Sequence, residues 1–149
     1  MDKLKWDRRF LDLARKISEW SKDPSTKVGA VVADKKTIVS VGYNGLPSNI
    51  TDTDEILSNR ALKYRLIIHA EINALNFAAR DIQGCTIYTY PFMPCHICAD
   101  TIIKSGITRV VSFYSINPRW VSSFNLTRTK LKKHRIELTE YEDFFQIKS

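Results

Sequence analysis

A regular alternation of helical and strand patterns in the second half of the chain constrains the fold most. Three segments with helical periodicity are each followed by a short run rich in β-branched and aromatic residues. The pairs are 69–80 with 85–89, 95–105 with 107–113, and 121–133 with 135–139. Strands that are separated by helices pair in parallel, with the helices packed on the sheet. The alternation therefore predicts an α/β fold with parallel strands.

The first half of the chain adds a helix and a β-hairpin. Within the first twenty residues, apolar side chains recur at three- and four-residue spacing, which is typical of an amphipathic helix. Two apolar runs, 28–33 and 37–43, flank a polar turn and predict a hairpin. Residues 44–59 are rich in Gly, Pro, Asn and Asp, which indicates a long loop before a helical segment near 60–66. We therefore expect a mixed sheet sandwiched between helices.

Length and composition bound the class of protein. At 149 residues and 44% hydrophobic content, the chain suits one compact domain, which we expect to span 1–149. No apolar stretch approaches the roughly 18 residues of a membrane span, and the amphipathic start differs from a signal peptide. Three cysteines cannot form a complete set of disulfides, which favours metal or redox chemistry in a reducing compartment. We expect a soluble, cytoplasmic protein.

The charge of the chain narrows its partners only in part. A formal net charge of +7 favours a partner that carries negative charge, or it describes a solvated basic surface. Free nucleotides and nucleic acid both satisfy the first interpretation, so charge leaves small and polymeric partners open.

Two short motifs carry candidate metal ligands, each at the start of a predicted helix. Cys95 and Cys98 are three residues apart on one helical face, so both sulfurs can bind one ion, and the helix N-terminus favours the thiolate. A catalytic zinc site uses three protein ligands and leaves one position open, and His69 is the candidate for the third. Glu71, two residues after His69, is poorly placed to bind the same ion and suits general acid–base catalysis instead.

These motifs together resemble the cytidine and deoxycytidylate deaminase superfamily, whose signature is His-x-Glu followed by Pro-Cys-x-x-Cys. The resemblance continues in three further runs and covers roughly residues 6 to 113. The runs are Asp23 to Ala30, Gly42 to Pro47, and Gly84 to Tyr88. It implies a three-layer α/β/α sandwich with a five-stranded mixed sheet. It also implies one catalytic zinc ion held by His69, Cys95 and Cys98, with Glu71 as the catalytic residue that moves protons.

Within the superfamily, the motifs most resemble those of deoxycytidylate deaminases. This resemblance implies hydrolysis of dCMP to dUMP and ammonia, which supplies dUMP for thymidylate synthesis. The implied substrate-binding residues are Ser25, Thr26, Lys27, Asn44, Ala70, Pro94, Tyr114 and Trp120. The candidates for an effector site are Gly42, Tyr43, Asn44 and Gly45. The implied effectors are dCTP and dTTP, and the implied assembly is a homo-oligomer, either a dimer or a hexamer.

Simpler interpretations of these residues remain open. Residues 25–27 equally suit an ordinary loop between a helix and a strand, and the glycines of 42–45 equally suit a tight turn. Tyr114 and Trp120 are equally compatible with the core. Pro91 stands where better-known relatives have a threonine or serine, so that contact to the substrate is missing or replaced.

Three other functions share part of this pattern. The same zinc chemistry would serve another cytosine nucleotide, or a nucleic acid deaminase acting on tRNA adenosine or single-stranded DNA cytosine. We expect no nucleic acid partner, because a protein that binds a nucleic acid polymer should carry an extended channel of basic and aromatic residues. A structural-zinc binding module would need a fourth ligand from Cys85, His96 or His134, and would leave Glu71 without a role.

Overall fold

A computed structural model describes residues 2–47, 53–59 and 67–144. In chain order, the elements are α1 (Lys3–Ser18), β1 (Gly29–Asp34), β2 (Thr37–Tyr43), α2 (Asp54–Ser58), α4 (Ala70–Phe77), β3 (Thr86–Tyr90), α5 (His96–Ser105), β4 (Arg109–Phe113), α6 (Val121–Lys133) and β5 (Glu137–Tyr141). None of the helices in these ranges combines the length and the apolar character that crossing a membrane requires.

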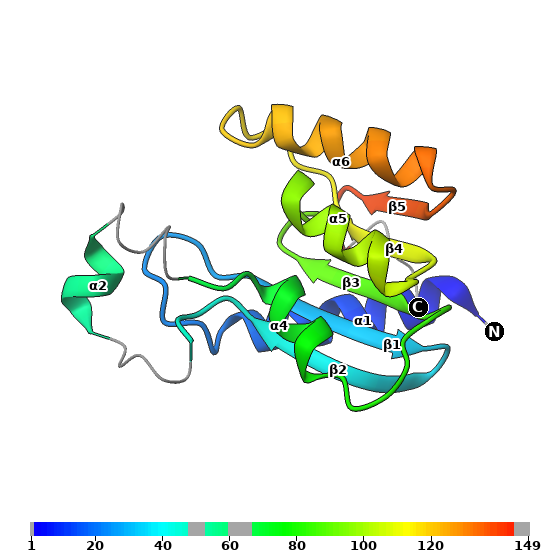
Figure 1. Ribbon diagram of the computed structural model, residues 1–149, viewed down its shortest axis with the longest axis horizontal. Coiled ribbons are helices and arrows are strands. Elements are labelled where there is room, and N and C mark those ends of the chain that lie inside the picture. The colour runs from blue at the N-terminus through cyan, green and yellow to red at the C-terminus, as the bar shows by residue number, and fades with distance from the viewer. Residues whose placement is uncertain (1, 48–52, 60–66, 145–149) are drawn as a thin grey trace.

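The sheet has five strands in the order β2-β1-β3-β4-β5, as Figure 1 shows. Strands β3, β4 and β5 are parallel, which confirms the pairing expected from the alternation of helices and strands. Strand β1 is antiparallel to both β2 and β3, so the sheet is mixed. The hairpin turn reverses the chain, and β1 rather than β2 lies beside β3.

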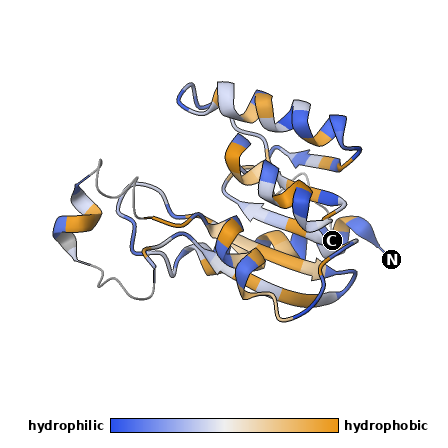
Figure 2. Cartoon of the chain, viewed as in Figure 1, coloured by the Kyte–Doolittle hydropathy of each residue, from blue (hydrophilic) through white to orange (hydrophobic). Residues whose placement is uncertain are grey.

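Helices cover both faces of the sheet, which confirms the predicted three-layer sandwich. Helix α1 packs on one face, and α4, α5 and α6 pack on the other (Figure 1). Strand β1 is hydrophobic almost throughout, as Figure 2 shows, because it contributes to both cores. Ala30 and Val32 belong to the core beneath α4 and α5, whereas Val31 and Ala33 belong to the core beneath α1. This alternation follows from the two-residue period of a strand.

A buried ion pair fastens α1 to the sheet. The guanidinium of Arg109 in β4 donates two hydrogen bonds of 2.7 Å to the Asp7 carboxylate, and the Tyr141 hydroxyl donates a third. Such bidentate geometry offsets much of the cost of burying both charges. Burial, together with the hydrogen bond to Asp7, raises the pKa of Tyr141 to about 12.

The structure differs from the sequence-based expectations mainly at the ends of elements. The predicted loop 44–59 contains the short helix α2, whose first turn is capped by the Thr53 side chain. Helix α4 ends at Phe77 rather than at Arg80, because the backbone turns extended at Ala78, and Arg80 pairs with Asp34 at the end of β1. The helical segment expected near 60–66 lies outside the described residues.

Candidate metal centre and active site

The candidate metal ligands lie at the first residues of α4 and α5. His69 is the N-cap residue of α4, and Cys95 is the N-cap residue of α5, with Cys98 in its first turn. The chain before His69 is held by a two-way backbone bridge, in which Gly45 and Ile68 each donate to the other's carbonyl. The two helix starts therefore place three potential ligands on one side of the sheet.

The three ligand atoms converge on one point. His69 Nδ1 lies 3.1 Å from Cys98 Sγ and 3.6 Å from Cys95 Sγ, and all three atoms lie within 4.8 Å of one another. One nitrogen and two sulfurs form a donor set that suits zinc with one position left open. Among the described residues, no fourth His, Cys, Asp or Glu joins the group.

The three residues that could supply a fourth zinc ligand lie outside the ligand group. Cys85 is buried in the core beneath α4 and α5, and His96 Nδ1 lies 2.9 Å from the Ser123 hydroxyl. His134 caps the C-terminus of α6. Three ligands with an open position are typical of a catalytic rather than a structural zinc site.

Hydrogen bonding at the start of α5 prepares a sulfur for metal binding. The hydrogen bond from the Cys98 thiol, with a further one from His69, holds the pKa of the Cys95 thiol well below its usual range. The Cys98 backbone N–H also donates to Cys95 Sγ at 3.5 Å. The thiolate is the form of cysteine that binds metal, and the lowered pKa of Cys95 favours this form.

Glu71 lies buried beside these ligands, with only 4% of its surface exposed. Burial raises the pKa of its carboxyl above the usual value, although the nearby His69 opposes the change. A carboxyl with a raised pKa gives up and takes back a proton more readily near neutral pH. Glu71 is therefore suited to proton transfer next to a metal.

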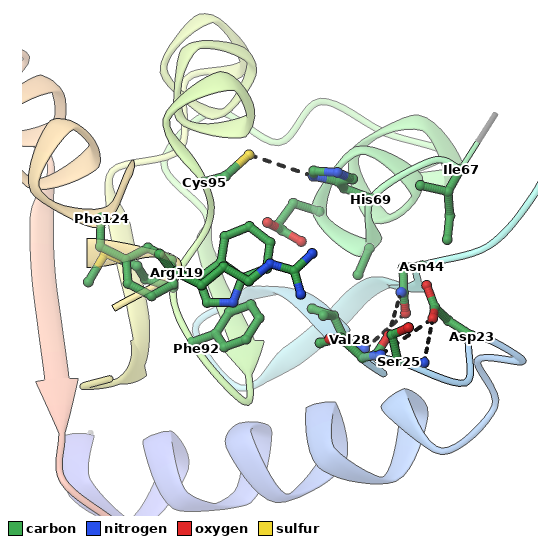
Figure 3. Close-up of a pocket in the computed structure, with 15 residues that line it drawn as sticks. Asp23, Ser25, Val28, Asn44, Ile67, His69, Phe92, Cys95, Arg119 and Phe124 are labelled. Atoms are coloured by element: carbon green, nitrogen blue, oxygen red, sulfur yellow. Dashed lines mark hydrogen bonds between the residues drawn. The ribbon is translucent and has the colours of Figure 1, made fainter. Parts of the chain in front are cut away.

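Two of the candidate ligands, His69 and Cys95, line a solvent-open cavity together with Glu71 (Figure 3). The cavity is lined by Asp23, Ser25, Thr26, Val28, Asn44, Ile67, His69, Ala70, Glu71, Phe92, Met93, Cys95, Arg119, Trp120 and Phe124. Five of the predicted substrate-binding residues are among them, namely Ser25, Thr26, Asn44, Ala70 and Trp120.

Three predicted substrate-binding residues do not line this cavity. The Lys27 ammonium donates to the Ser21 carbonyl at 2.8 Å. Pro94 is buried, and its carbonyl accepts a hydrogen bond from the Thr127 hydroxyl. The Tyr114 ring is exposed, with the Arg128 guanidinium 5.4 Å from its centroid.

Asn44 and Asp23 shape one wall of the cavity through hydrogen bonds to the backbone (Figure 3). The Asn44 amide accepts from Val28 N at 2.9 Å and donates to the Thr26 carbonyl at 2.9 Å. Asp23 Oδ1 accepts from the N–H groups of Ser25 and Thr26. Both side chains therefore fix the segment that leads into β1.

The predicted effector residues divide between two environments. Tyr43, Asn44 and Gly45 line a second hollow of about 1190 Å³, a volume that includes open solvent. The exposed side chain of Trp20 also lines this hollow. Gly42 lies against α4, where an added Cβ would be 2.5 Å from the Ala70 carbonyl oxygen. Gly42 therefore has a packing role, since it lets β2 and α4 approach closely.

The cavity is also lined by Phe92, Arg119 and Phe124, which were not among the predicted site residues. The rings of Trp120 and Phe124 lie with centroids 5.9 and 5.5 Å from that of Phe92, and the three form an aromatic wall. Arg119 precedes Trp120 and also lines the cavity. Phe92 could have been found from its place just before the Pro-Cys motif, whereas Arg119 has no spacing signal.

The chain is similar in sequence to known deaminases. A family model described as the cytidine and deoxycytidylate deaminase zinc-binding region matches residues 4–114. A protein of Aliivibrio fischeri named as an uncharacterized deaminase is 40% identical over 141 residues, covering 91% of this chain and 92% of that protein. The deoxycytidylate deaminase of Homo sapiens is 38% identical over 74% of this chain, and that of Mus musculus is 39% identical over the same share. The match spans 65% of the human and mouse proteins, which are longer than the matched region.

The fold recurs in crystal structures of the dCMP deaminase from cyanophage S-TIM5. The apo form has a TM-score of 0.74 at 22% identity, covering 95% of this chain and 100% of that chain. The form in complex with dCMP and dUMP has a TM-score of 0.72 at the same identity, covering 95% of this chain and 98% of that chain. This likeness supports the fold, and the family model and the sequence relatives establish that the chain belongs to the cytidine and deoxycytidylate deaminase family.

Proposed function

We propose that the protein is a zinc-dependent hydrolase that converts dCMP to dUMP and ammonia, and so supplies dUMP for thymidylate synthesis. The observation that carries the proposal is the convergence of three ligand atoms at a cavity that is lined by His69, Cys95 and the buried Glu71. Family membership supports the reaction class. The names of the mammalian relatives support dCMP as the substrate.

In the proposed mechanism, His69, Cys95 and Cys98 hold the zinc ion. When bound, zinc acts as a Lewis acid that makes a coordinated water more acidic. Glu71 would take one proton from the water as its oxygen bonds to C4 of the cytosine, and would deliver that proton to N3. It would then take the second proton from the new hydroxyl group on C4 and pass it to the amino group, so that the C4–N bond breaks, ammonia leaves and the C4 carbonyl of uracil forms. The raised pKa of Glu71 supports both transfers, because one carboxyl must accept and release protons within each turnover.

The cavity walls orient the base for this chemistry. The segment held by Asn44 forms one wall, and the rings of Phe92 and Trp120 form another. Apolar and aromatic walls exclude water and strengthen the electrostatic interactions inside a site. Ser25, Thr26, Asn44, Ala70 and Trp120 accordingly remain the proposed substrate contacts.

The proposal extends to assembly and regulation. We infer a cytoplasmic homo-oligomer, a dimer or a hexamer, that responds to dCTP and dTTP. The exposed rings of Trp20, Tyr43 and Phe77 around the second hollow support an interface or effector site there. Three free thiols, those of Cys85, Cys95 and Cys98, are consistent with a reducing compartment.

Ammonia release from zinc-loaded protein tests the proposed function. The substrates are dCMP, CMP, deoxycytidine, dCTP and a short cytosine oligonucleotide, each with and without dCTP and dTTP as effectors. We expect dCMP to react fastest. Glu71→Gln should retain zinc and lose activity by about 100- to 10,000-fold, the range of general acid–base catalysis.

The matched control is Glu55→Gln, because Glu55 is exposed on α2 and does not line the cavity. It should keep wild-type activity. The proposal is wrong if no cytosine substrate is deaminated, or if Glu71→Gln is as active as the wild type.

A further inference from the structure

We propose that Arg119 binds the 5′-phosphate of the substrate and thereby selects nucleotides over nucleosides. This inference rests on the proposed function and names the residue that recognises the charged end of the substrate. Among the described residues that line it, Asp23 and Glu71 are acidic, and Arg119 is the only lysine or arginine. A phosphate that enters an acidic cavity needs a cation to offset its charge.

The loop that the sequence suggested for the phosphate supplies no such cation. The Lys27 ammonium is bonded to the Ser21 carbonyl and does not line the cavity. The backbone N–H groups of Ser25 and Thr26 both donate to the Asp23 carboxylate. A phosphate at those amides would therefore meet a carboxylate of the same charge. The loop can add hydroxyl groups, but the positive charge must come from elsewhere.

The chain around Arg119 holds this residue at the start of α6. The Asn117 side chain accepts a hydrogen bond from Arg119 N at 3.0 Å, and the Asn117 carbonyl accepts one from Trp120 N at 3.0 Å. The Arg119 guanidinium carbon lies 4.8 Å from the centroid of the Trp120 ring. Trp120 packs on Phe92, so the arginine is supported by the aromatic wall of the cavity.

The guanidinium points into the cavity, toward the side where Ser25 and Asn44 lie (Figure 3). A nucleotide carries its base and its phosphate at opposite ends of the sugar. If the base lies against the metal ligands and Glu71, the phosphate lies toward the mouth, where Arg119 is exposed. Guanidinium groups bind phosphate through two parallel hydrogen bonds, which a lysine cannot reproduce.

Steady-state kinetics with dCMP and deoxycytidine test the inference. Arg119→Met keeps an apolar stem over Trp120 and removes the charge, so kcat/KM for dCMP should fall about 10- to 100-fold. The value for deoxycytidine should stay within about twofold, because the nucleoside has no phosphate. For dCMP, the kcat/KM of Arg119→Lys should lie between those of the wild type and Arg119→Met, since lysine keeps the charge and loses the planar guanidinium. Arg80→Met is the control, because Arg80 pairs with Asp34 outside the cavity, and it should leave the ratio of the two substrates unchanged.

The ratio of dCMP to deoxycytidine activity separates phosphate binding from a purely structural role. The inference would be overturned if Arg119→Met left the ratio of kcat/KM for dCMP to that for deoxycytidine unchanged, whether both values fall equally or neither falls. If Lys27→Met instead lowered the ratio of dCMP to deoxycytidine activity, the phosphate would be assigned to the loop that carries Lys27. Calorimetric binding of dUMP and deoxyuridine gives a second readout, in which Arg119→Met should weaken dUMP alone. This measurement tests the phosphate contact even if the wild type releases no ammonia, an outcome that would refute only the proposed function.

Discussion

Replacing Gly42 with alanine should displace the helix that carries Glu71. Gly42 lies in β2, and an added Cβ would be 2.5 Å from the Ala70 carbonyl oxygen and closer still to Ala74 N. Both are backbone atoms of α4, so no side-chain rotation can relieve the overlap. Because ordinary contacts begin near 3.4 Å, the helix would have to withdraw by about 1 Å in a core that is otherwise close-packed.

Both stability and catalysis should respond to this displacement. Overpacking of a core costs about 1–3 kcal/mol. With a urea m-value of about 2 kcal/mol/M, the unfolding midpoint should fall by about 0.5–1.5 M. A misplacement of about 1 Å in an active site can reduce the rate by about 100-fold. Since His69 caps α4 and Glu71 lies in its first turn, kcat should fall while the protein still folds.

The matched control is Gly45→Ala in the same motif. The nearest atom to a Cβ at Gly45 is a ring carbon of Tyr43 at 3.9 Å, so the change in stability should stay below about 0.5 kcal/mol. Urea unfolding and dCMP deamination of both variants measure the difference. A Gly42→Ala protein with the midpoint and kcat of the wild type would refute the packing argument. Loss of the dCTP response alone would instead favour an effector-binding role for Gly42.

Two further predictions concern the metal and alkaline pH. Cys98→Ser should lose most of the bound zinc in metal analysis after gel filtration, whereas Cys85→Ser should keep it, because Cys85 lies outside the ligand group; equal zinc content in both would contradict the ligand assignment. Since the pKa of Tyr141 is raised from 10.0 to about 12, its stabilising contribution is complete below pH 10 and is lost as the pH rises through 12. Urea unfolding between pH 10 and 12 should therefore show a shallower loss of stability in Tyr141→Phe, and identical slopes would exclude this residue as the cause.

Local sequence patterns predicted which segments form helices and strands. They predicted less well which strands lie side by side in the sheet. The alternation of helices and strands predicted the parallel order of β3, β4 and β5, because each crossover helix returns the chain in the same direction. It did not predict that β1 would lie antiparallel beside β3, which depends on tertiary packing. The burial of β1 on both faces, compared with the exposed positions of β2, is the signal that separates the central strand from the edge strand.

The grouping of the two cysteines was predictable from local spacing, whereas the side chains that line the cavity depend in part on tertiary contacts. Cys95 and Cys98 share a helical face by spacing alone. The direction of the Lys27 side chain is instead determined by the Ser21 carbonyl, a contact that no sequence period encodes. Arg119 reaches the cavity from a loop, in which the Asn117 side chain accepts a hydrogen bond from the Arg119 backbone.

The location of the site follows from the direction of the strands. The ends of the parallel strands β3 and β4 lead directly into the segments that carry Cys95 and Arg119. Strand β1 is antiparallel to β3, and its first residue, Gly29, pairs with Tyr90 at the end of β3, so the loop before β1 reaches the same edge. The ligands sit on helix starts packed against the sheet, while Arg119 sits on a loop that connects β4 to α6. Substitutions in that loop should therefore alter substrate preference without altering zinc content, and this separation makes the kinetic test of Arg119 interpretable.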